Sequence, residues 1–269
     1  MESGLALAWI SRGTSPVDWC EDNYTVTPHI AEFVNTVSNV LFLFVPAACS
    51  KLWISYSIHV SKGIHLVLAF FTVIGLSSAY FHATLSLLGQ LLDELSILWL
   101  LMVSYSLFTP VRNRPFSLQS NPVLYRTVLA LIGILTTGFA FIKPEINQYA
   151  LFLAGMPAVG MLAKEMRFST DSRVGWLGKL TLFTFAIASL AWISDKFCCR
   201  LWQGLNLTVL HGIWHVLIFV SSYTMQVLFC YFYAMQDVPQ SKPDLRFWPG
   251  KSWGLPYIHC RSNNSTKCP

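Results

Sequence analysis

The sequence predicts an all-α integral membrane protein, a bundle of seven transmembrane helices with its N-terminus in the lumen and its C-terminus in the cytosol. Three observations lead to this prediction. Hydrophobic residues make up 54% of the 269-residue chain and charged residues only 12%, about half of the roughly 25% found in soluble domains. Seven apolar stretches are long enough to cross a hydrocarbon core, which takes roughly 20 helical residues. The basic residues gather in the loops of one side.

The seven expected spans divide the chain into three parts. A short turn at Lys143–Glu145 separates the fourth and fifth spans, so we expect these two to form an antiparallel hairpin. The parts are an N-terminal segment, residues 1–32, a seven-span domain, residues 33–234, and a tail, residues 235–269. In chain order the spans are residues 33–53, 64–85, 88–109, 124–143, 146–166, 175–195 and 209–234.

The distribution of basic residues predicts the orientation. With seven spans, the N-terminal side of the membrane holds only Arg12, Lys143, Lys196 and Arg200 of the 18 Lys and Arg residues. Basic loops favour the cytosol, so the N-terminal segment is expected in the lumen and the tail in the cytosol. Residues 1–10 lack the basic start of a cleavable signal peptide. The net charge of +5 then indicates a basic fringe facing anionic lipid, not nucleic-acid binding.

Polar residues at the ends of several spans are expected to converge at one depth, near the lumenal surface. Ser78 and His82 lie one turn apart at the end of the second span, and Asp93 lies in the first turns of the third. His211 and His215 open the seventh span, four residues apart and so on one helix face. A lone histidine at a helix end is usually a packing residue. Several ionisable groups at one depth in a membrane indicate a functional site.

Three imidazoles, a carboxylate and a hydroxyl are the components of a zinc hydrolase. Catalytic zinc usually has three protein ligands and leaves its fourth position to water, whose pKa the metal lowers to about 7. His82, His211 and His215 are therefore the expected zinc ligands. Asp93 is placed to pass a proton to a departing amine, and Ser78 to donate to the developing oxyanion. The neighbouring Glu94 is expected to make a surface or inter-helix contact.

The segment before the first span is acidic and holds a cysteine. Asp18, Glu21, Asp22 and Glu32 offer oxygen ligands of the kind that calcium takes, but not at the spacing of an EF-hand. From these residues alone, a solvated acidic loop is the favoured interpretation. Cys20 and the adjacent pair Cys198–Cys199 both fall on the lumenal side, where a disulfide can persist.

Several strings of this sequence resemble one known family. They extend through most of the chain, and each is long enough to be specific: VDWCEDNY (Val17–Tyr24), FHATLS (Phe81–Ser86), GQLLDE (Gly89–Glu94), WISD (Trp192–Asp195) and LHGIWH (Leu210–His215). On these motifs the chain resembles the alkaline ceramidases. The resemblance implies a seven-span, zinc-dependent membrane amidase that hydrolyses the N-acyl bond of ceramide to sphingosine and a free fatty acid.

The resemblance also implies the residues of the site and its cofactors. It implies a disulfide from Cys20, for which the family spacing selects Cys199 over Cys198. The implied location is the membrane of the endoplasmic reticulum or Golgi. Ceramide from the bilayer and membrane lipids are the implied partners, with no nucleic acid and no obligate protein partner. The implied ligands are zinc at His82, His211 and His215, beside Asp93 and Ser78, and calcium at Asp18, the Trp19 carbonyl, Glu21, Asn23 and Glu32.

Other membrane functions compete with the hydrolase. Asn121–Tyr125 is similar to a motif of seven-span receptors, but it opens the fourth span instead of closing the seventh. A zinc-containing lipid receptor with little or no hydrolase activity is the nearer alternative, because the same ligands could serve either function. A transporter could carry protons on Asp93 and Asp195. Transporters often pair broken helices rich in Gly and Pro, and the sequence shows no such pair.

Overall fold

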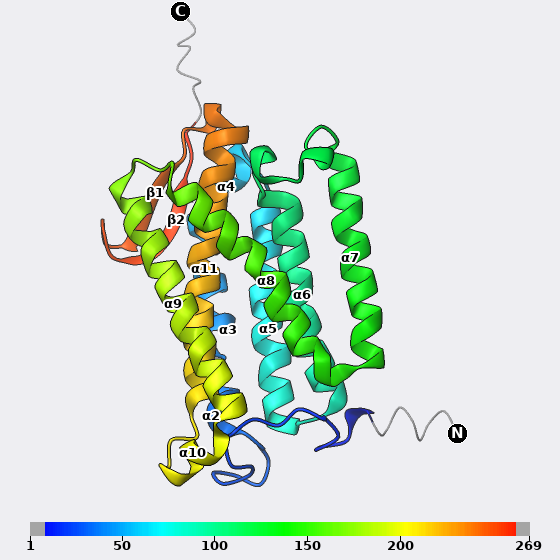
Figure 1. The fold of residues 1–269 in the computed structure, drawn as a ribbon. Helices are drawn as coiled ribbons and strands as arrows, with labels where there is room; N and C mark the ends of the chain where they lie inside the picture. Colours follow the sequence, from blue (N-terminus) through cyan, green and yellow to red (C-terminus); the bar gives the residue numbers. More distant parts are fainter. Residues whose placement is uncertain (1–8, 262–269) are drawn as a thin grey trace, which may run out of the picture.

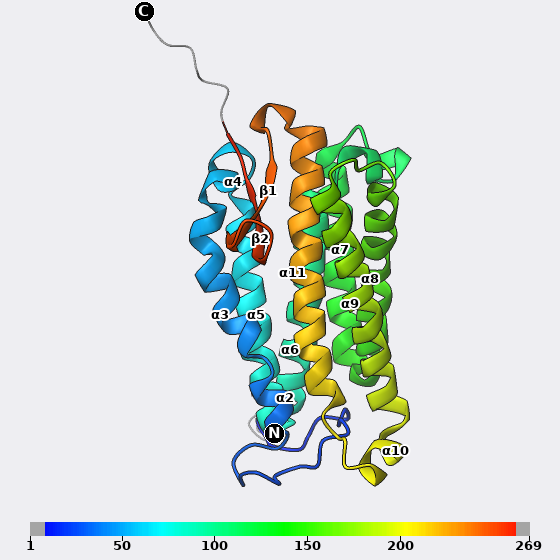
Figure 2. The ribbon, with the colours of Figure 1, turned by 90° about the vertical axis from the view of Figure 1, so that its left-hand side faces the viewer.

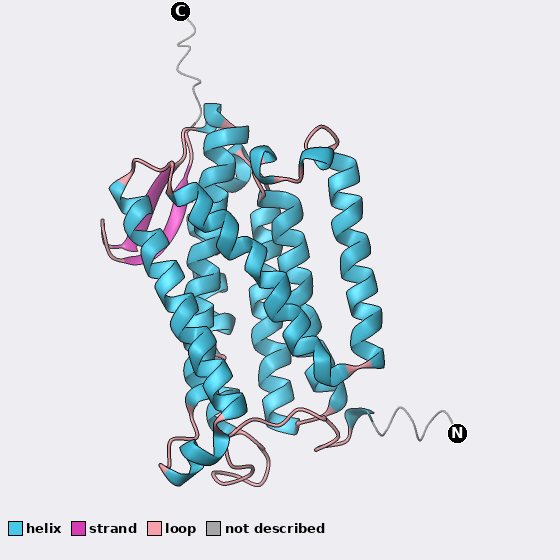
Figure 3. Cartoon of the chain, viewed as in Figure 1, coloured by secondary structure: helices cyan, strands magenta, loops and turns pink. Residues whose placement is uncertain are grey.

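Seven helical segments, each long and apolar enough to cross a membrane, form the body of the protein. The computed structural model describes residues 9–261, and in this part of the chain the segments stand side by side as a bundle (Figures 1 and 3). They overlap the predicted spans one for one, which confirms the seven-span fold. In chain order they are Phe33–His59, Gly63–Thr84 (α5), Leu87–Phe108 (α6), Pro122–Ile142 (α7), Pro144–Met166 (α8), Ser172–Phe197 (α9) and Leu210–Asp237 (α11).

The first span is broken, where the sequence predicted one continuous stretch over residues 33–53. Ser38 Oγ and Asn39 Nδ2 both donate to the carbonyl of Asn35, at 3.0 and 2.9 Å. Such side-chain donors compete with the backbone for the carbonyl and interrupt a helix. The span extends to His59, and its pieces are α2 (Phe33–Val37), α3 (Val40–Cys49), the 3-10 turn η1 (Ser50–Trp53) and α4 (Ile54–His59).

A tight turn joins α5 to α6 and brings two site residues to the same end of the bundle. Leu85 ends α5 in the left-handed region, with φ of 48°. Ser86 then caps α6, because its hydroxyl accepts the backbone N–H of Gly89 at 3.1 Å. The chain therefore reverses within two residues, so His82 near the end of α5 and Asp93 near the start of α6 lie at one level.

The other turns at this end are equally short. Lys143 alone separates α7 from α8, and Pro144 begins α8, which confirms the predicted hairpin (Figure 1). Pro is favoured in the first turn of a helix, since its missing N–H has no partner there in any case. This turn places the start of α8 beside the start of α6, where Gln90 Nε2 donates to the Pro144 carbonyl at 2.9 Å.

The last span, α11, is the most deeply buried of the seven, and α7 is the least buried. Small polar residues let α11 approach α9 closely. Thr181 Oγ1 donates to Thr224 Oγ1 at 2.8 Å, and Ser221 Oγ donates to the Thr181 carbonyl at 3.2 Å. On its other side, Phe219 contacts the Phe42 ring edge to face, with centroids 4.9 Å apart. These contacts hold α11 in the middle of the bundle (Figure 2).

The predicted tail contains an antiparallel hairpin that the sequence analysis did not foresee. Its strands are β1 (Asp244–Pro249) and β2 (Gly254–His259), paired from Asp244 with His259 to Pro249 with Gly254. Leu245 and Ile258 are fully buried. The hairpin packs against η1, α4 and α11, at the opposite end of the bundle from the N-terminal segment (Figures 1 and 2).

The N-terminal segment lies across the end where α5 and α6 turn (Figure 2). Its backbone bonds to the end of α5: Ala31 N–H donates to the Ala83 carbonyl at 3.1 Å and Glu32 N–H donates to the His82 carbonyl at 3.0 Å. A disulfide joins Cys20 to Cys199, the first residue of α10 (Cys199–Gly204). The implied pairing is thus confirmed.

The remaining cysteines within residues 9–261 form no disulfide. Cys49, Cys198, Cys230 and Cys260 are free thiols, and Cys268 lies outside the described residues. The orientation of the bundle across a membrane stays a prediction.

Candidate metal site and cavity

Three histidines from two helices converge at the end covered by the N-terminal segment. The centroids of His82 and His211 lie 5.1 Å apart, those of His82 and His215 4.9 Å, and those of His211 and His215 4.7 Å. All three side chains are buried, and each offers one ring nitrogen within 4.8 Å of the others. His82 comes from the end of α5 and the other two from the first turns of α11. The predicted meeting of these rings is confirmed.

The free ring nitrogens fit a metal such as zinc. Among the described residues, His211 Nδ1 and His215 Nε2 are buried and have no hydrogen-bond partner, although buried polar atoms are nearly always bonded. A ligating histidine usually directs its second nitrogen to a carboxylate or another polar group. His215 Nδ1 lies 2.6 Å from Ser38 Oγ, and His82 Nδ1 contacts Glu32 Oε2. The group therefore has both the donors and the supports of a zinc site.

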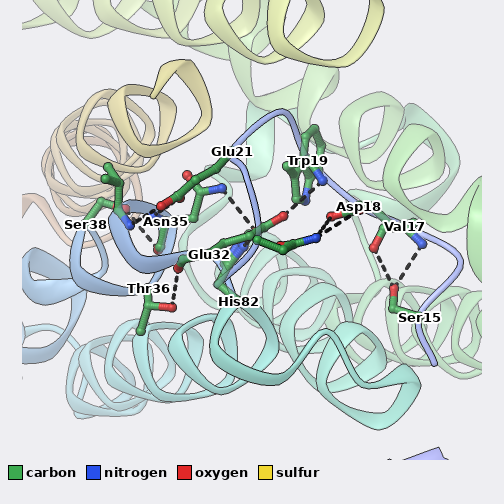
Figure 4. Close-up of polar contacts among 12 residues, drawn as sticks. Ser15, Val17, Asp18, Trp19, Glu21, Glu32, Asn35, Thr36, Ser38 and His82 are labelled. Atoms are coloured by element: carbon green, nitrogen blue, oxygen red, sulfur yellow. Dashed lines mark hydrogen bonds and ion pairs between the residues drawn. The ribbon is translucent and has the colours of Figure 1, made fainter. Parts of the chain in front are cut away.

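Glu32 contacts the histidine group directly, whereas the family resemblance implied for it only a role in calcium binding. It is fully buried. Its Oε2 bonds to His82 Nδ1 and accepts from Asn35 Nδ2 at 3.1 Å, while its Oε1 accepts the Trp19 N–H at 3.0 Å (Figure 4). This contact could not be predicted from residue spacing, because it arises from the backbone pairing of residues 31–32 with the end of α5.

The other acidic residues of the N-terminal segment also have protein partners. Glu21 accepts the N–H groups of Val34 and Asn35 at 2.6 and 2.8 Å and so caps α2. Asn23 Nδ2 donates to both Asp18 oxygens at 3.3 Å. Within residues 9–261, the three histidines form the one group of three or more such side chains with the spacing for a metal. The calcium site stays a prediction.

Three carboxyl groups of the N-terminal segment nevertheless share a raised pKa. Burial, and then the charge of Glu32, raises the pKa of Asp18. Burial also raises the pKa of Glu21, against hydrogen bonds from Val34 and Asn35 that lower it. Burial likewise raises the pKa of Glu32. Two buried carboxyls, Glu21 and Glu32, beside the exposed carboxyl of Asp18 are costly when all are ionised, and a bound cation would relieve that cost.

Asp93 and Ser78 lie together beside the histidines. Their side chains, on α6 and α5, both line the cavity that His211 and His215 also line. The structure therefore brings together the carboxylate, the hydroxyl and two of the three imidazoles around one space.

That space is an apolar cavity of about 200 Å³ with its polar groups at one end. Along α11 its lining extends from His211 to Met225, about 21 Å of helix at 1.5 Å per residue. Away from the histidines the lining includes Phe42, Leu100 and Ala158. A smaller cavity of about 70 Å³ shares several of these lining residues and reaches Thr109. A space of this kind suits a lipid whose polar group lies beside the metal site.

Comparisons with known proteins agree with this geometry. A sequence model of the family described as Ceramidase matches residues 11–259. The chain belongs to the alkaline ceramidase family. It is 42% identical over 261 residues to the alkaline ceramidase of Drosophila melanogaster, covering 96% of this chain and 92% of that protein. Alkaline ceramidase 1 of Homo sapiens is 35% identical over 253 residues, covering 93% and 96%. Membership of this family confirms the prediction that the chain is a ceramidase, and it favours an enzyme over a receptor or a transporter.

In this ceramidase, Trp19 closes the cavity over the histidines. Its ring stacks on His211 with centroids 3.7 Å apart, and Lys196 Nζ lies 5.0 Å from its centroid, an arrangement in which cation and ring attract. The Cys20 N–H donates to Asp195 Oδ2 at 3.1 Å. Together with the disulfide, these contacts fix the N-terminal segment against α9 and α11. The spacing of residues in the sequence did not predict that Trp19 covers the histidines.

Glu94 makes the inter-helix contact expected of it, and it also reaches the cavity of the ceramidase. Its two oxygens accept Gln90 Nε2 at 3.1 Å and Asn147 Nδ2 at 2.7 Å. The side chain is 7% exposed and lines the cavity beside Asp93. Glu94 thus ties α6 to α8 at the polar end of the cavity.

Proposed function

We propose that this enzyme hydrolyses the N-acyl bond of ceramide to sphingosine and a free fatty acid, at zinc bound by His82, His211 and His215. One observation supports this most: in a chain of the ceramidase family, three buried histidines meet, and two of them, each with an unpartnered ring nitrogen, line the polar end of an apolar cavity. When bound, zinc would supply a Lewis acid and a water of lowered pKa.

The residues of the chain then have distinct roles. Glu32 orients His82, and Ser38 orients His215, through the second nitrogen of each ring. Asp93 takes a proton from the attacking water and gives it to the departing amine. Ser78 donates to the oxyanion that forms on the carbonyl.

The cavity and its cover perform the remaining tasks. The apolar walls hold the lipid tails, while Trp19 limits the access of water to the histidines. Excluding water strengthens the electrostatic interactions between the site and the reacting amide.

The zinc proposal is tested with His211→Ala. We expect the purified variant to lose bound zinc and sphingosine release together, because only two protein ligands are left. His65→Ala is the matched control, since His65 is exposed near the start of α5, far from the site. Metal analysis and a turnover assay with labelled ceramide measure both properties. Full zinc content with full turnover in His211→Ala would refute the proposal.

We further propose a calcium ion bound by Asp18, the Trp19 carbonyl, Glu21, Asn23 and Glu32. Support comes from the grouped carboxyls, whose pKa values burial raises, and from the shared Glu32, which would connect calcium to His82. A calcium titration of turnover tests it: Asp18→Asn should need more calcium for half-maximal activity. An unchanged calcium dependence in Asp18→Asn would refute the calcium site and leave the zinc proposal untouched.

We also propose that residues 1–32 are lumenal, that residues 33–234 span the membrane of the endoplasmic reticulum or Golgi, and that residues 235–269 are a cytosolic tail. The supporting facts are the positions of the two segments at opposite ends of the bundle and the bias of basic residues toward the tail side. The active site would then lie near the lumenal surface.

A further inference from the structure

Two amide side chains in the cavity have no use in the mechanism. Asn39 lies between α2 and α3 and is fully buried, and Gln148, in the first turns of α8, is 8% exposed. Both line the cavity at the end where the histidines and Asp93 lie. In the described part of the chain, Asn39 Oδ1 and Gln148 Oε1 are buried without a hydrogen-bond partner. Two residues that line the cavity therefore each carry a buried acceptor without a protein partner.

The direction of each amide group is determined by its own contact. Asn39 Nδ2 donates to the Asn35 carbonyl at 2.9 Å, and Gln148 Nε2 donates to the Glu145 carbonyl at 3.1 Å. Rotating either amide by half a turn would place its oxygen against a carbonyl oxygen, where no hydrogen bond can form. The oxygens, not the NH₂ groups, are thus the free ends.

A buried acceptor left without a partner costs free energy, so these oxygens are expected to gain one when the site is filled. A sphingoid base carries two hydroxyl groups next to the amide, and both are donors. Two free acceptors at the polar end of an otherwise apolar cavity match those two donors in number and in kind.

We propose that Asn39 Oδ1 and Gln148 Oε1 accept hydrogen bonds from the hydroxyl groups of the sphingoid base and so select substrates that carry them. This inference rests on the proposed hydrolysis of ceramide. It makes both residues specificity determinants, distinct from the groups that act on the amide bond.

The experiment compares kcat/KM for ceramide with kcat/KM for two analogues, one lacking the C1 hydroxyl and one lacking the C3 hydroxyl. The wild-type enzyme should prefer ceramide over each analogue by about tenfold, the worth of roughly one net hydrogen bond. Gln148→Met and Asn39→Ala should each lose that preference against one analogue. Gln148→Glu retains an acceptor oxygen and should retain the preference.

The ratio of kcat/KM between ceramide and each analogue does not depend on how much of the protein is folded, because a smaller active fraction lowers all three rates equally. Ser189→Ala is the matched control: Ser189 lines the same cavity, but its hydroxyl donates to the Phe185 carbonyl at 2.9 Å, so the ratios should stay at wild-type values. If either Gln148→Met or Asn39→Ala keeps the wild-type preference for ceramide over both analogues, the proposal is overturned. That result is expected if a water molecule, and not a substrate hydroxyl, bonds to the acceptor. Failure of the wild type to hydrolyse ceramide would instead refute the proposed function.

Discussion

Glu32 shows how a single side chain joins two parts of the enzyme. Its carboxylate contacts His82 through one oxygen and the backbone of Trp19 through the other. A carboxylate behind a ligating histidine fixes the ring and increases its basicity. Glu32 therefore connects the position of the N-terminal segment to the candidate metal site, whether or not calcium binds beside it.

We expect Glu32→Gln to weaken zinc binding by about 10- to 100-fold, the usual cost of losing such a support. Competition with a zinc chelator measures this affinity directly. Asp22→Asn is the control, because it removes a negative charge from the same segment at an exposed position. Equal zinc affinity in Glu32→Gln and wild type would show that the carboxylate does not support the ligand.

Asp93 is expected to act on the reaction and not on the metal. Asp93→Asn keeps the shape of the side chain but cannot accept a proton, so kcat should fall by about 10²- to 10⁴-fold while zinc content stays at the wild-type level. Turnover under saturating ceramide and metal analysis of the same sample check the two parts. Turnover close to wild type would exclude Asp93 as the proton carrier.

For single residues, the positions of the histidines and Asp93 in the site could be predicted from the sequence, because helix periodicity determines them. His211 and His215 share a face by their spacing, and topology puts His82 at the same depth. The partners of Glu32, Asn39 and Gln148 were beyond such reasoning. Their contacts depend on how a loop and a helix break pack, which no periodic pattern records.

Among the elements, the N-terminal segment depends most on a covalent bond. The disulfide links Cys20 to α10 across 179 residues of sequence, and crosslinks of long loops restrict the unfolded chain strongly. This bond holds Trp19 over His211.

We expect Cys20→Ser to lower the free energy of unfolding by about 2 to 4 kcal/mol and to reduce turnover as the segment loosens. Cys198→Ser is a close control, because Cys198 is an exposed free thiol next to the bridged residue. Thermal unfolding with and without reductant measures the effect. Similar melting of Cys20→Ser and Cys198→Ser would show that the bridge contributes no stability.

Salt bridges and a hydrogen bond made by Arg173 connect the β-hairpin to the start of α9. Arg173 Nη2 lies 2.9 Å from Asp171 Oδ2 and 3.1 Å from Asp244 Oδ1, and its Nη1 donates to the Leu245 carbonyl at 2.8 Å. The hydrogen bond from Arg173 holds the pKa of Asp171 below its ordinary value of 3.8. The ionised carboxylate is thus favoured in the folded protein.

This shift gives the pH dependence a definite sign. A carboxyl with a lowered pKa stabilises the fold above its unfolded pKa and loses that contribution as pH falls through the folded value. The melting temperature of wild type should therefore exceed that of Asp171→Asn by a constant amount near neutrality, and the difference should shrink below about pH 4. A difference that grows on acidification would contradict the assignment.

Elements differ in how far the sequence determines them. The seven spans were predictable because each long apolar run has one stable arrangement in a bilayer, a helix with its backbone bonds satisfied internally. The break after Val37 and the hairpin of six-residue strands depend on side-chain competition and on packing against η1 and α4. Short elements of that kind give no comparable pattern.

For the whole molecule, the proposed orientation yields a direct test. An epitope added to the C-terminus should be digested by protease in sealed microsomes, because the tail is proposed to be cytosolic, whereas an N-terminal epitope should be protected until detergent is added. The ratio of surviving epitopes on an immunoblot measures this. Protection of the C-terminal epitope would reverse the orientation and place the active site at the cytosolic surface.

The candidate metal site lies at one end of the bundle, and this limits which molecules the enzyme meets. A ceramide molecule keeps its head group at the surface of its own leaflet, so only the leaflet at the N-terminal end presents the amide at the right depth. Ceramide in the opposite leaflet must first flip across the bilayer. The rate of that flip, and not only the amount of enzyme, then sets how quickly a membrane can be cleared of the lipid.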